Sequence, residues 1–249
     1  MQVRRHLLYC YHLSMSEIQR IVLKNGVTLF PFVSKDEVVD YADKKKCILI
    51  AMNAGKVGRS SEEMVSIINR NVGYADGIAA VAVLKKRGFK NATKIPGCEL
   101  WLDIVSRKYK DSTFYLVGGK QEVIDAVVEK LQKDFPGIHI AGYRNGYMSD
   151  QDEKALIDDI ATKKPDVVFV AMGSPKQELL MERMQSLHPA IYQGLGGSFD
   201  VYTGRMKRAP EWWIKHNLEG PYRVMTDLKK WKRFVQDLWV MVKIKLGCI

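Results

Sequence analysis

Short apolar runs alternate with amphipathic stretches along most of this chain, and the alternation restricts the folds open to it. The apolar runs have the length of buried strands and lie at 47–52, 113–117, 138–141, 167–172 and 191–195. The stretches between them have helical periodicity and lie at 60–70, 78–87, 99–108, 121–133, 150–162 and 176–187. Buried strands separated by helices are typical of a mostly parallel sheet with helices on both faces. The sequence therefore predicts a Rossmann-like α/β fold, in which ligands bind at the carboxyl ends of the strands.

Positive charge is concentrated near the C-terminus. The net charge is +11, and residues 201–249 hold 11 Lys and Arg against 4 Asp and Glu, with four of the five tryptophans. After Trp231, apolar residues follow at helical spacing among lysines, at Phe234, Val235, Leu238, Trp239, Val242 and Leu246. Two interpretations stay open, a helix packed on the core with a solvated basic back and an interfacial helix on an anionic membrane. We predict a core over 1–204 and a basic helical appendage over 205–249.

The sequence argues against several other classes of protein. Cys10, Cys47, Cys98 and Cys248 form no C-x-x-C pair, which is typical of reduced thiols. No run approaches the roughly 18 apolar residues of a membrane-spanning helix. Residues 4–16 lack a small-residue cleavage site, so we expect no signal peptide. We expect a protein of the cytoplasm, without metal or cofactor, docked on the inner face of the cytoplasmic membrane. Nucleic acid is not an expected partner, because the C-terminal aromatic residues lie in a helix.

Two strand-like runs end in glycine turns that suit an anionic ligand. The first turn leads into a helix through Gly173, Ser174, Pro175, Lys176 and Gln177. Backbone N–H groups at such a helix start favour a phosphate oxygen. The second turn contains Gly118, Gly119 and Lys120, where two glycines would let the backbone approach a diphosphate. A plain tight turn is the alternative interpretation.

A third glycine turn precedes a dense group of cations. Gly196 and Gly197 follow a strand and lead through Asp200 to Lys207 and Arg208. An apolar core has no use for such charge, so neutralisation of a phosphate is favoured over a random solvated loop.

Three further positions carry polar groups at the predicted ligand edge. Asn53 follows the first strand, where it either contacts a substrate or fixes the turn. Asp76 precedes an apolar helix, where it is either that helix's N-cap or a general base toward a sugar hydroxyl. Asp150 and Asp152 match the D-x-D pattern of metal-dependent transferases, but acidic residues also favour a helix start, and we prefer that interpretation.

In this order the segments resemble the WecG/TagA/CpsF family, glycosyltransferase family 26, of bacterial surface polysaccharide synthesis. The similar segments are 74–77, 96–101, 114–119, 142–147, 170–178 and 196–210. They are most similar to the branch that transfers N-acetylmannosaminuronic acid. The resemblance implies an inverting, metal-independent enzyme. It would move an N-acetylmannosamine-type sugar from a UDP donor to a GlcNAc on undecaprenyl diphosphate.

The resemblance also implies roles for individual residues. Asp76 matches the family's general base, Gln177 a residue beside the reacting sugar, and Asn53 an early polar contact. Lys120, Lys207 and Arg208 are our candidates for stabilising the departing UDP. Cations that touch the membrane and the acceptor diphosphate match Arg223, Lys230 and Arg233.

The chain departs from the family pattern at a few positions. Ala51, Lys94 and Glu99 replace the usual Thr, Arg and Asp, and Lys94 keeps a charge for the donor without bidentate geometry. Gly220-Pro221 replaces Trp-Leu, which predicts a break or altered docking of the appendage. The donor therefore stays open, with another UDP-hexose such as glucose as the alternative.

Two other function classes are disfavoured. A nucleotide-dependent oxidoreductase would need a glycine fingerprint after the first strand, which residues 53–56 do not supply. A non-catalytic adaptor would bind through the basic end without releasing UDP. The sequence leaves a homo-oligomer open.

Overall fold

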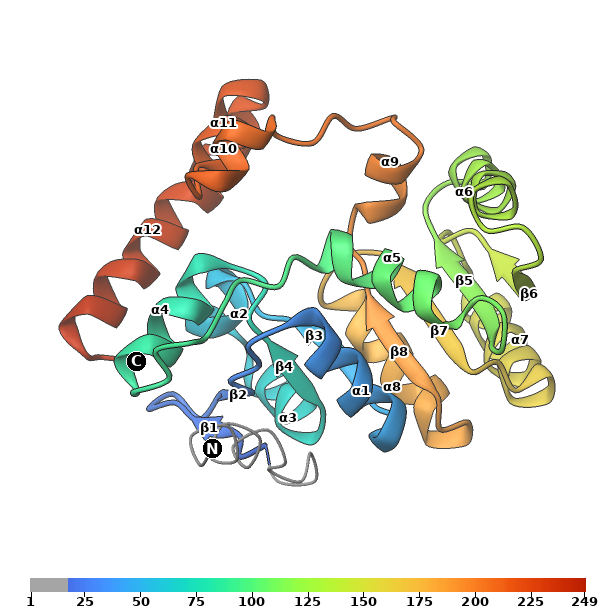
Figure 1. Cartoon of the computed structure of the whole chain (residues 1–249), viewed down its shortest axis with the longest axis horizontal. Coiled ribbons are helices and arrows are strands. Elements are labelled where there is room, and N and C mark those ends of the chain that lie inside the picture. Colours follow the sequence, from blue (N-terminus) through green and yellow to red (C-terminus); the bar gives the residue numbers. More distant parts are fainter. Residues whose placement is uncertain (1–17) are drawn as a thin grey trace, which may run out of the picture.

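A six-stranded sheet in which every neighbouring pair is parallel forms the centre of the protein (Figure 1). The computed structural model describes residues 18–249. The strands lie in the order β4-β3-β8-β7-β5-β6. Their bounds are β3 (Ile48–Ala51), β4 (Val72–Tyr74), β5 (Thr113–Gly118), β6 (His139–Arg144), β7 (Val167–Ala171) and β8 (Ile191–Gly194). The predicted Rossmann-like parallel sheet is confirmed.

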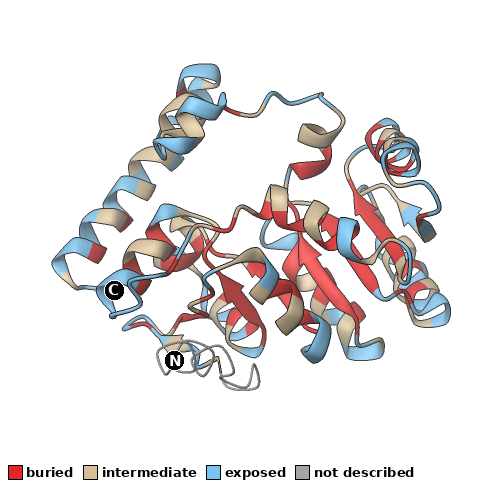
Figure 2. Cartoon of the chain, viewed as in Figure 1, coloured by how far each residue is buried: buried red, intermediate tan, exposed pale blue. Residues whose placement is uncertain are grey.

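Helices cover both faces of this sheet, and the buried residues are concentrated between the helical layers (Figure 2). One face carries α2 (Ala54–Arg59), α3 (Glu62–Arg70), α4 (Ile78–Lys86), α7 (Asp150–Lys163) and α8 (Lys176–Leu187). The other face carries α1 (Lys35–Lys45), α5 (Gly97–Lys108), α6 (Gln121–Asp134) and α9 (Ser198–Tyr202). Along β7, Val168 and Val170 enter the first core while Val167 and Phe169 enter the second. Strand alternation thus supplies both cores from one apolar run.

The five predicted strands and six predicted helices are found close to their expected positions. In the core, the sequence analysis missed α1, α2, α9, β4 and a small hairpin of β1 (Ile21–Val22) and β2 (Thr28–Leu29). Strand β4 has three residues and α2 has six, which is too short for a clear period. Helix α1 is defined by its Ser34 cap, by acidic residues in its first turn and by lysines in its last turn.

Residues 205–249, which we call the C-terminal arm, form a helical extension along one side of the core (Figure 1). Its elements are α10 (Glu211–Lys215), α11 (Glu219–Thr226), the 3₁₀ turn η3 (Leu228–Lys230) and α12 (Trp231–Leu246). Helix α12 packs on α2 and α4 through buried Val240 and Ile244. The approach is close at Gly58, where an added Cβ would lie 2.5 Å from a Val240 methyl.

The apolar face predicted for α12 points largely away from the core. Trp231, Leu238, Trp239, Val242 and Leu246 are exposed. Helix α12 does pack on the core and its lysines are exposed, as one interpretation stated, but Val240 and Ile244 make the contact and not the predicted face. No helix breaks at Pro221, since it lies in the first turn of α11, where its missing N–H costs no helical bond, and the alternative of an altered docking of the arm stays a prediction.

Two expectations concerned membrane segments. Within residues 18–249, no helix has both the length and the apolar character to cross a bilayer. The signal-peptide prediction falls on residues 4–16, which lie outside the described part of the chain.

Candidate active site

The carboxyl ends of the parallel strands bring most of the predicted site residues to one edge of the sheet. Asn53 follows β3, Asp76 follows β4, and the glycine pairs follow β5 and β8. Gly173 follows β7. Asp76 therefore lies at the β4 end of this edge, and Gln177 follows β7, the third strand along from β4. The two residues are on the same edge, as the hypothesis of a common site requires.

Asp76 is half-buried and held in place by a second helix. Its Oδ1 accepts a hydrogen bond from the Gly97 backbone N–H at 2.7 Å, and Gly97 is the first residue of α5. The interpretation of Asp76 as the N-cap of the following helix is wrong, because Gly77 is the N-cap of α4 and no side chain caps that helix. Within residues 18–249, no group donates a hydrogen bond to the second Asp76 oxygen. One oxygen is thus fixed while the other is available to accept a proton.

A buried polar pair supports the Asp76 loop from below. The Gln193 amide Nε2 donates to the Tyr74 hydroxyl and to the Gly97 carbonyl, each at 3.2 Å. Burial, together with the nearby Asp76 charge, raises the pKa of Tyr74 well above its usual value. The hydroxyl therefore stays neutral beside the carboxylate. Sequence analysis gave neither residue a role, since Gln193 reads as an ordinary residue of a predicted strand and Tyr74 belongs to the unpredicted strand β4.

Gln177 connects two of the glycine loops. It is buried in the first turn of α8, and its Oε1 accepts from the Gly173 N–H at 3.2 Å and the Gly196 N–H at 3.0 Å. Its Nε2 donates to Glu178 Oε1 at 3.1 Å. All of these partners belong to the protein, so Gln177 fixes the loops from beneath. Its contact with a sugar stays a prediction.

A buried ion pair anchors Gln177. Lys56 Nζ lies 3.0 Å from Glu178 Oε1, and the two side chains are 9% and 1% exposed. The same ammonium donates to the Ala51 carbonyl at 3.2 Å. The second Glu178 oxygen is buried and has no hydrogen-bond partner among the described residues. The pair joins the β3 loop to α8, and the sequence analysis missed it because the two residues are far apart in the chain.

The remaining polar and glycine positions of the edge mainly shape its loops. Asn53 Oδ1 accepts from the Lys56 N–H at 3.1 Å and caps α2, which is the turn-fixing alternative. Gly118 has a φ of 128°, and a Cβ there would lie 2.2 Å from the Ala171 carbonyl oxygen. Only glycine fits at that point. The Gly119 N–H donates to the same carbonyl at 3.1 Å, so it is used within the turn.

The predicted cations divide into exposed and paired groups. Those exposed to solvent are Lys120, Lys176, Lys207, Arg223 and Arg233, and Ser174 and Gly197 are exposed with them. Arg208 instead bonds to Glu99 of α5 at 2.5 Å, Lys94 pairs with Glu219 of α11, and Lys230 pairs with Asp227 at 3.4 Å. Asp200 is half-buried, and its carbonyl accepts from the Met206 N–H at 2.9 Å. The structure therefore leaves Lys120, Lys176 and Lys207 accessible to a phosphate.

Glu99 is held as an anion where the start of the C-terminal arm meets α5. Burial opposes its charge, but the Arg208 hydrogen bond and the charges of Arg208 and Lys35 outweigh that effect and lower the pKa of Glu99. The Arg208–Glu99 ion pair between the C-terminal arm and the core is therefore present over the physiological pH range.

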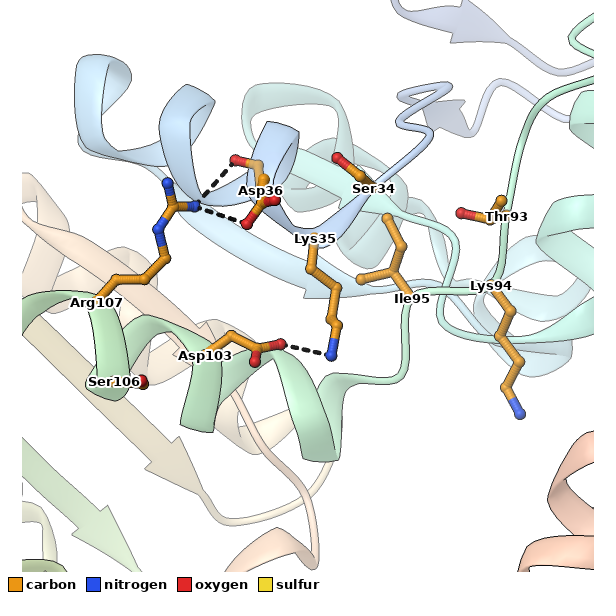
Figure 3. Close-up of a pocket in the computed structure, with 9 residues that line it drawn as sticks. All are labelled: Ser34, Lys35, Asp36, Thr93, Lys94, Ile95, Asp103, Ser106 and Arg107. Carbon is orange, nitrogen blue, oxygen red and sulfur yellow. Dashed lines mark hydrogen bonds and ion pairs between the residues drawn. The ribbon is translucent and has the colours of Figure 1, made fainter.

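A cavity of about 450 Å³ lies between α1 and α5, beside residues 93–95 (Figure 3). Three cations line it, but Lys35 is bound to Asp103 at 2.7 Å, Arg107 to Asp36 at 3.2 Å, and Lys94 to Glu219. Figure 3 shows the Lys94 side chain directed away from the Lys35–Asp103 pair. These charges are neutralised within the protein, so the cavity is a poor phosphate site.

The D-x-D pair begins helix α7, as the preferred interpretation stated. Ser149 and Asp152 form a reciprocal capping box, and Arg144 bonds to Asp152 at 2.7 Å. The Arg144 hydrogen bond, with those from Ser149, lowers the pKa of Asp152 to about 2. Within residues 18–249, no group of three or more His, Cys, Asp or Glu side chains is placed to hold a metal ion.

Glycine loops and a fixed carboxylate lie at the carboxyl edge of a doubly wound parallel sheet, which is the edge where α/β proteins of this class bind their ligands. The chain belongs to the Glycosyl transferase WecG/TagA/CpsF family, whose profile matches residues 28–246. It is similar to an N-acetylglucosaminyldiphosphoundecaprenol N-acetyl-beta-D-mannosaminyltransferase of Bacillus spizizenii (strain ATCC 23059 / NRRL B-14472 / W23). The two are 44% identical over 164 residues, which are 64% of this chain and 62% of the relative. The match thus spans less than two thirds of the relative's length.

Proposed function

We propose that this protein is an inverting, metal-independent glycosyltransferase. It transfers an N-acetylmannosamine-type sugar, N-acetylmannosamine or N-acetylmannosaminuronic acid, from UDP to a GlcNAc on undecaprenyl diphosphate. Family membership supports the reaction class, and the name of the Bacillus relative supports the sugar and the acceptor. The observation that carries the proposal is Asp76, fixed through one oxygen by Gly97 and open at the other.

The chemistry is a single displacement with Asp76 as base. The acceptor hydroxyl oxygen attacks the anomeric carbon from the side opposite UDP and gives its proton to the free Asp76 oxygen. The new C–O bond forms as the bond to UDP breaks, so UDP leaves with the electron pair and the anomeric configuration inverts. Proton transfer of this kind contributes roughly 10²–10⁴-fold to the rate. In this mechanism Lys120, Lys176 and Lys207, which are exposed, neutralise the charge on departing UDP.

A panel of donors tests the function directly. Purified full-length protein is incubated with a short-chain polyprenyl-diphosphate GlcNAc and one UDP-sugar at a time, and mass spectrometry identifies the product. We expect transfer from UDP-N-acetylmannosamine or its uronic acid, at an equal rate with EDTA present. Transfer of glucose instead would replace the proposed donor. EDTA inhibition reversed by Mn²⁺ would reinstate a metal mechanism.

The C-terminal arm supports a second part of the proposal, peripheral docking on an anionic membrane. The exposed face of α12 carries Trp239 and Leu246, and Lys232, Lys243 and Lys245 are exposed on the same helix. Tryptophan and lysine are the residues that anchor helices at the headgroup level. In this proposal, residues 205–249 dock on the membrane and help to close the site. Their cations Arg223, Lys230 and Arg233 contact the acceptor diphosphate.

Substituting the exposed face should release the protein from membranes without unfolding it. We expect Trp239→Ser with Leu246→Ser to remove about 3 kcal/mol of apolar burial, or roughly 10²-fold in partitioning. The measurement is co-sedimentation with vesicles that contain phosphatidylglycerol. Leu187→Ser is the matched control, because Leu187 is 61% exposed on α8. Equal losses for both variants, or no loss, would refute docking through α12.

A further inference from the structure

Residues 94–99, which we call the bridging segment, lie between Asp76 and the C-terminal arm. On the core side, the Ile95 N–H donates to the Ala75 carbonyl at 2.8 Å, and the Gly97 N–H donates to Asp76 at 2.7 Å. On the arm side, Lys94 pairs with Glu219. The segment also ends in Glu99, which binds Arg208 at 2.5 Å. One short stretch of chain therefore holds the carboxylate and both of these arm contacts.

The Lys94–Glu219 contact is largely shielded from solvent, and Glu219 belongs to a part of the arm that packs on the core. The Lys94 and Glu219 side chains are each only 19% exposed, so solvent and salt screen this pair less than a surface pair. Glu219 is the first residue of α11, where a negative charge also suits the helix start. The next residue, Gly220, lies against Phe234 of α12, since an added Cβ would be 3.2 Å from the ring. Helix α12 in turn packs on α2 and α4.

We propose that the arm positions the Asp76 carboxylate through this bridging segment. Lys94, Glu219, Glu99 and Arg208 are positioning residues, because their two ion pairs flank Gly97, whose N–H orients Asp76. Lys94 thereby links core and arm, in place of the donor contact that the sequence analysis assigned to it. The catalytic consequence rests on the proposed function of Asp76, whereas the mechanical link between arm and segment does not.

A double-variant cycle tests the catalytic consequence. We expect Lys94→Met and Glu219→Gln each to lower kcat about tenfold with an unchanged KM for the UDP-sugar, because misplacing a reacting group by 1 Å can cost about 10²-fold. Since both variants break one link, the double variant should be no slower than the slower single variant. The swap of Lys94→Glu with Glu219→Lys should recover part of kcat. Additive losses, or a donor KM raised by Lys94→Met alone, would overturn the positioning role.

Cys98 gives a readout that needs no activity. It lies in the segment between Gly97 and Glu99, is half-buried, and burial raises the pKa of its thiol. The experiment uses a variant in which Cys10→Ser and Cys248→Ser remove two other thiols. The remaining Cys47 is buried, so peptide mass spectrometry can follow iodoacetamide labelling at Cys98. Glu219→Gln should speed this labelling several-fold at an unchanged thermal midpoint. Glu211→Gln is the control within the arm, because it removes an exposed ion pair with Lys215, and it should leave the Cys98 labelling rate unchanged.

The two experiments separate the two ideas. If wild-type protein transfers no sugar, the proposed function fails, and the Cys98 rates still decide whether the arm holds the segment. If Glu219→Gln leaves the Cys98 rate at the wild-type value, the link fails even where transfer is observed. Faster labelling with Glu219→Gln, together with non-additive kcat losses, supports the proposal in full.

Discussion

Asp76→Asn is expected to lower kcat by roughly 10²–10⁴-fold, the usual contribution of a positioned general base. Asparagine keeps a side-chain oxygen that can accept the Gly97 hydrogen bond, which Asp76 accepts at 2.7 Å. The variant should therefore fold normally. It loses only the ability to take the proton of the acceptor hydroxyl at its second oxygen.

The measurement is steady-state transfer together with UDP binding by calorimetry. UDP affinity should stay within about twofold, because the carboxylate does not contact the leaving diphosphate in the proposed mechanism. Asp158→Asn is the matched control, since Asp158 is an exposed aspartate of α7. A variant with wild-type kcat would end the assignment of Asp76 as base.

Glu178→Gln is expected to lower the free energy of unfolding by about 3–5 kcal/mol, because removing one partner of a buried ion pair leaves the other charge uncompensated. Lys56 and Glu178 are 9% and 1% exposed, so water can do little to solvate the remaining ammonium. The glutamine keeps an oxygen for the Gln177 amide, so the loss reports on the charge. Urea unfolding followed by circular dichroism gives the value.

Two further variants test whether the loss of stability comes from the buried, uncompensated charge. Lys56→Met combined with Glu178→Gln removes both charges and should recover most of the lost stability. Glu182→Gln breaks the more exposed ion pair with Arg70, which should cost less than about 1 kcal/mol. Equal costs for Glu178→Gln and Glu182→Gln would show that burial of the pair has no special weight.

Local patterns predicted the framework of the fold. The apolar run of β7 at Val167–Ala171 and the capping residues of α7 are strong signals that act over a few residues. The same holds for the carboxyl-edge positions, because parallel strands place their following loops together. Strand β4 escaped prediction because three residues form it, although Asp76 follows it directly.

The contacts that organise the site could not be predicted in this way. Asp76 had two open interpretations, the N-cap of its own helix or a general base, but its carboxylate accepts from the Gly97 N–H at the start of α5, 21 positions along the chain. Tyr74 and Gln193, and likewise Lys56 and Glu178, meet only because the sheet order brings β4, β3, β8 and β7 together. A cation such as Lys94 looks available to a ligand in the sequence, and only the position of Glu219 shows that its charge is already used. Pairings across the sheet depend on strand order, which local periodicity does not specify.

The absence of a side chain at Gly58 lets α12 pack closely on α2. Because an added Cβ would lie 2.5 Å from a Val240 methyl, α12 rests where only a hydrogen fits. We expect a bulkier residue at position 58 to push α12 away from α2. Glu219, on the adjoining helix α11, would then shift with the arm. The seating of α12 on α2 therefore depends on a glycine at position 58.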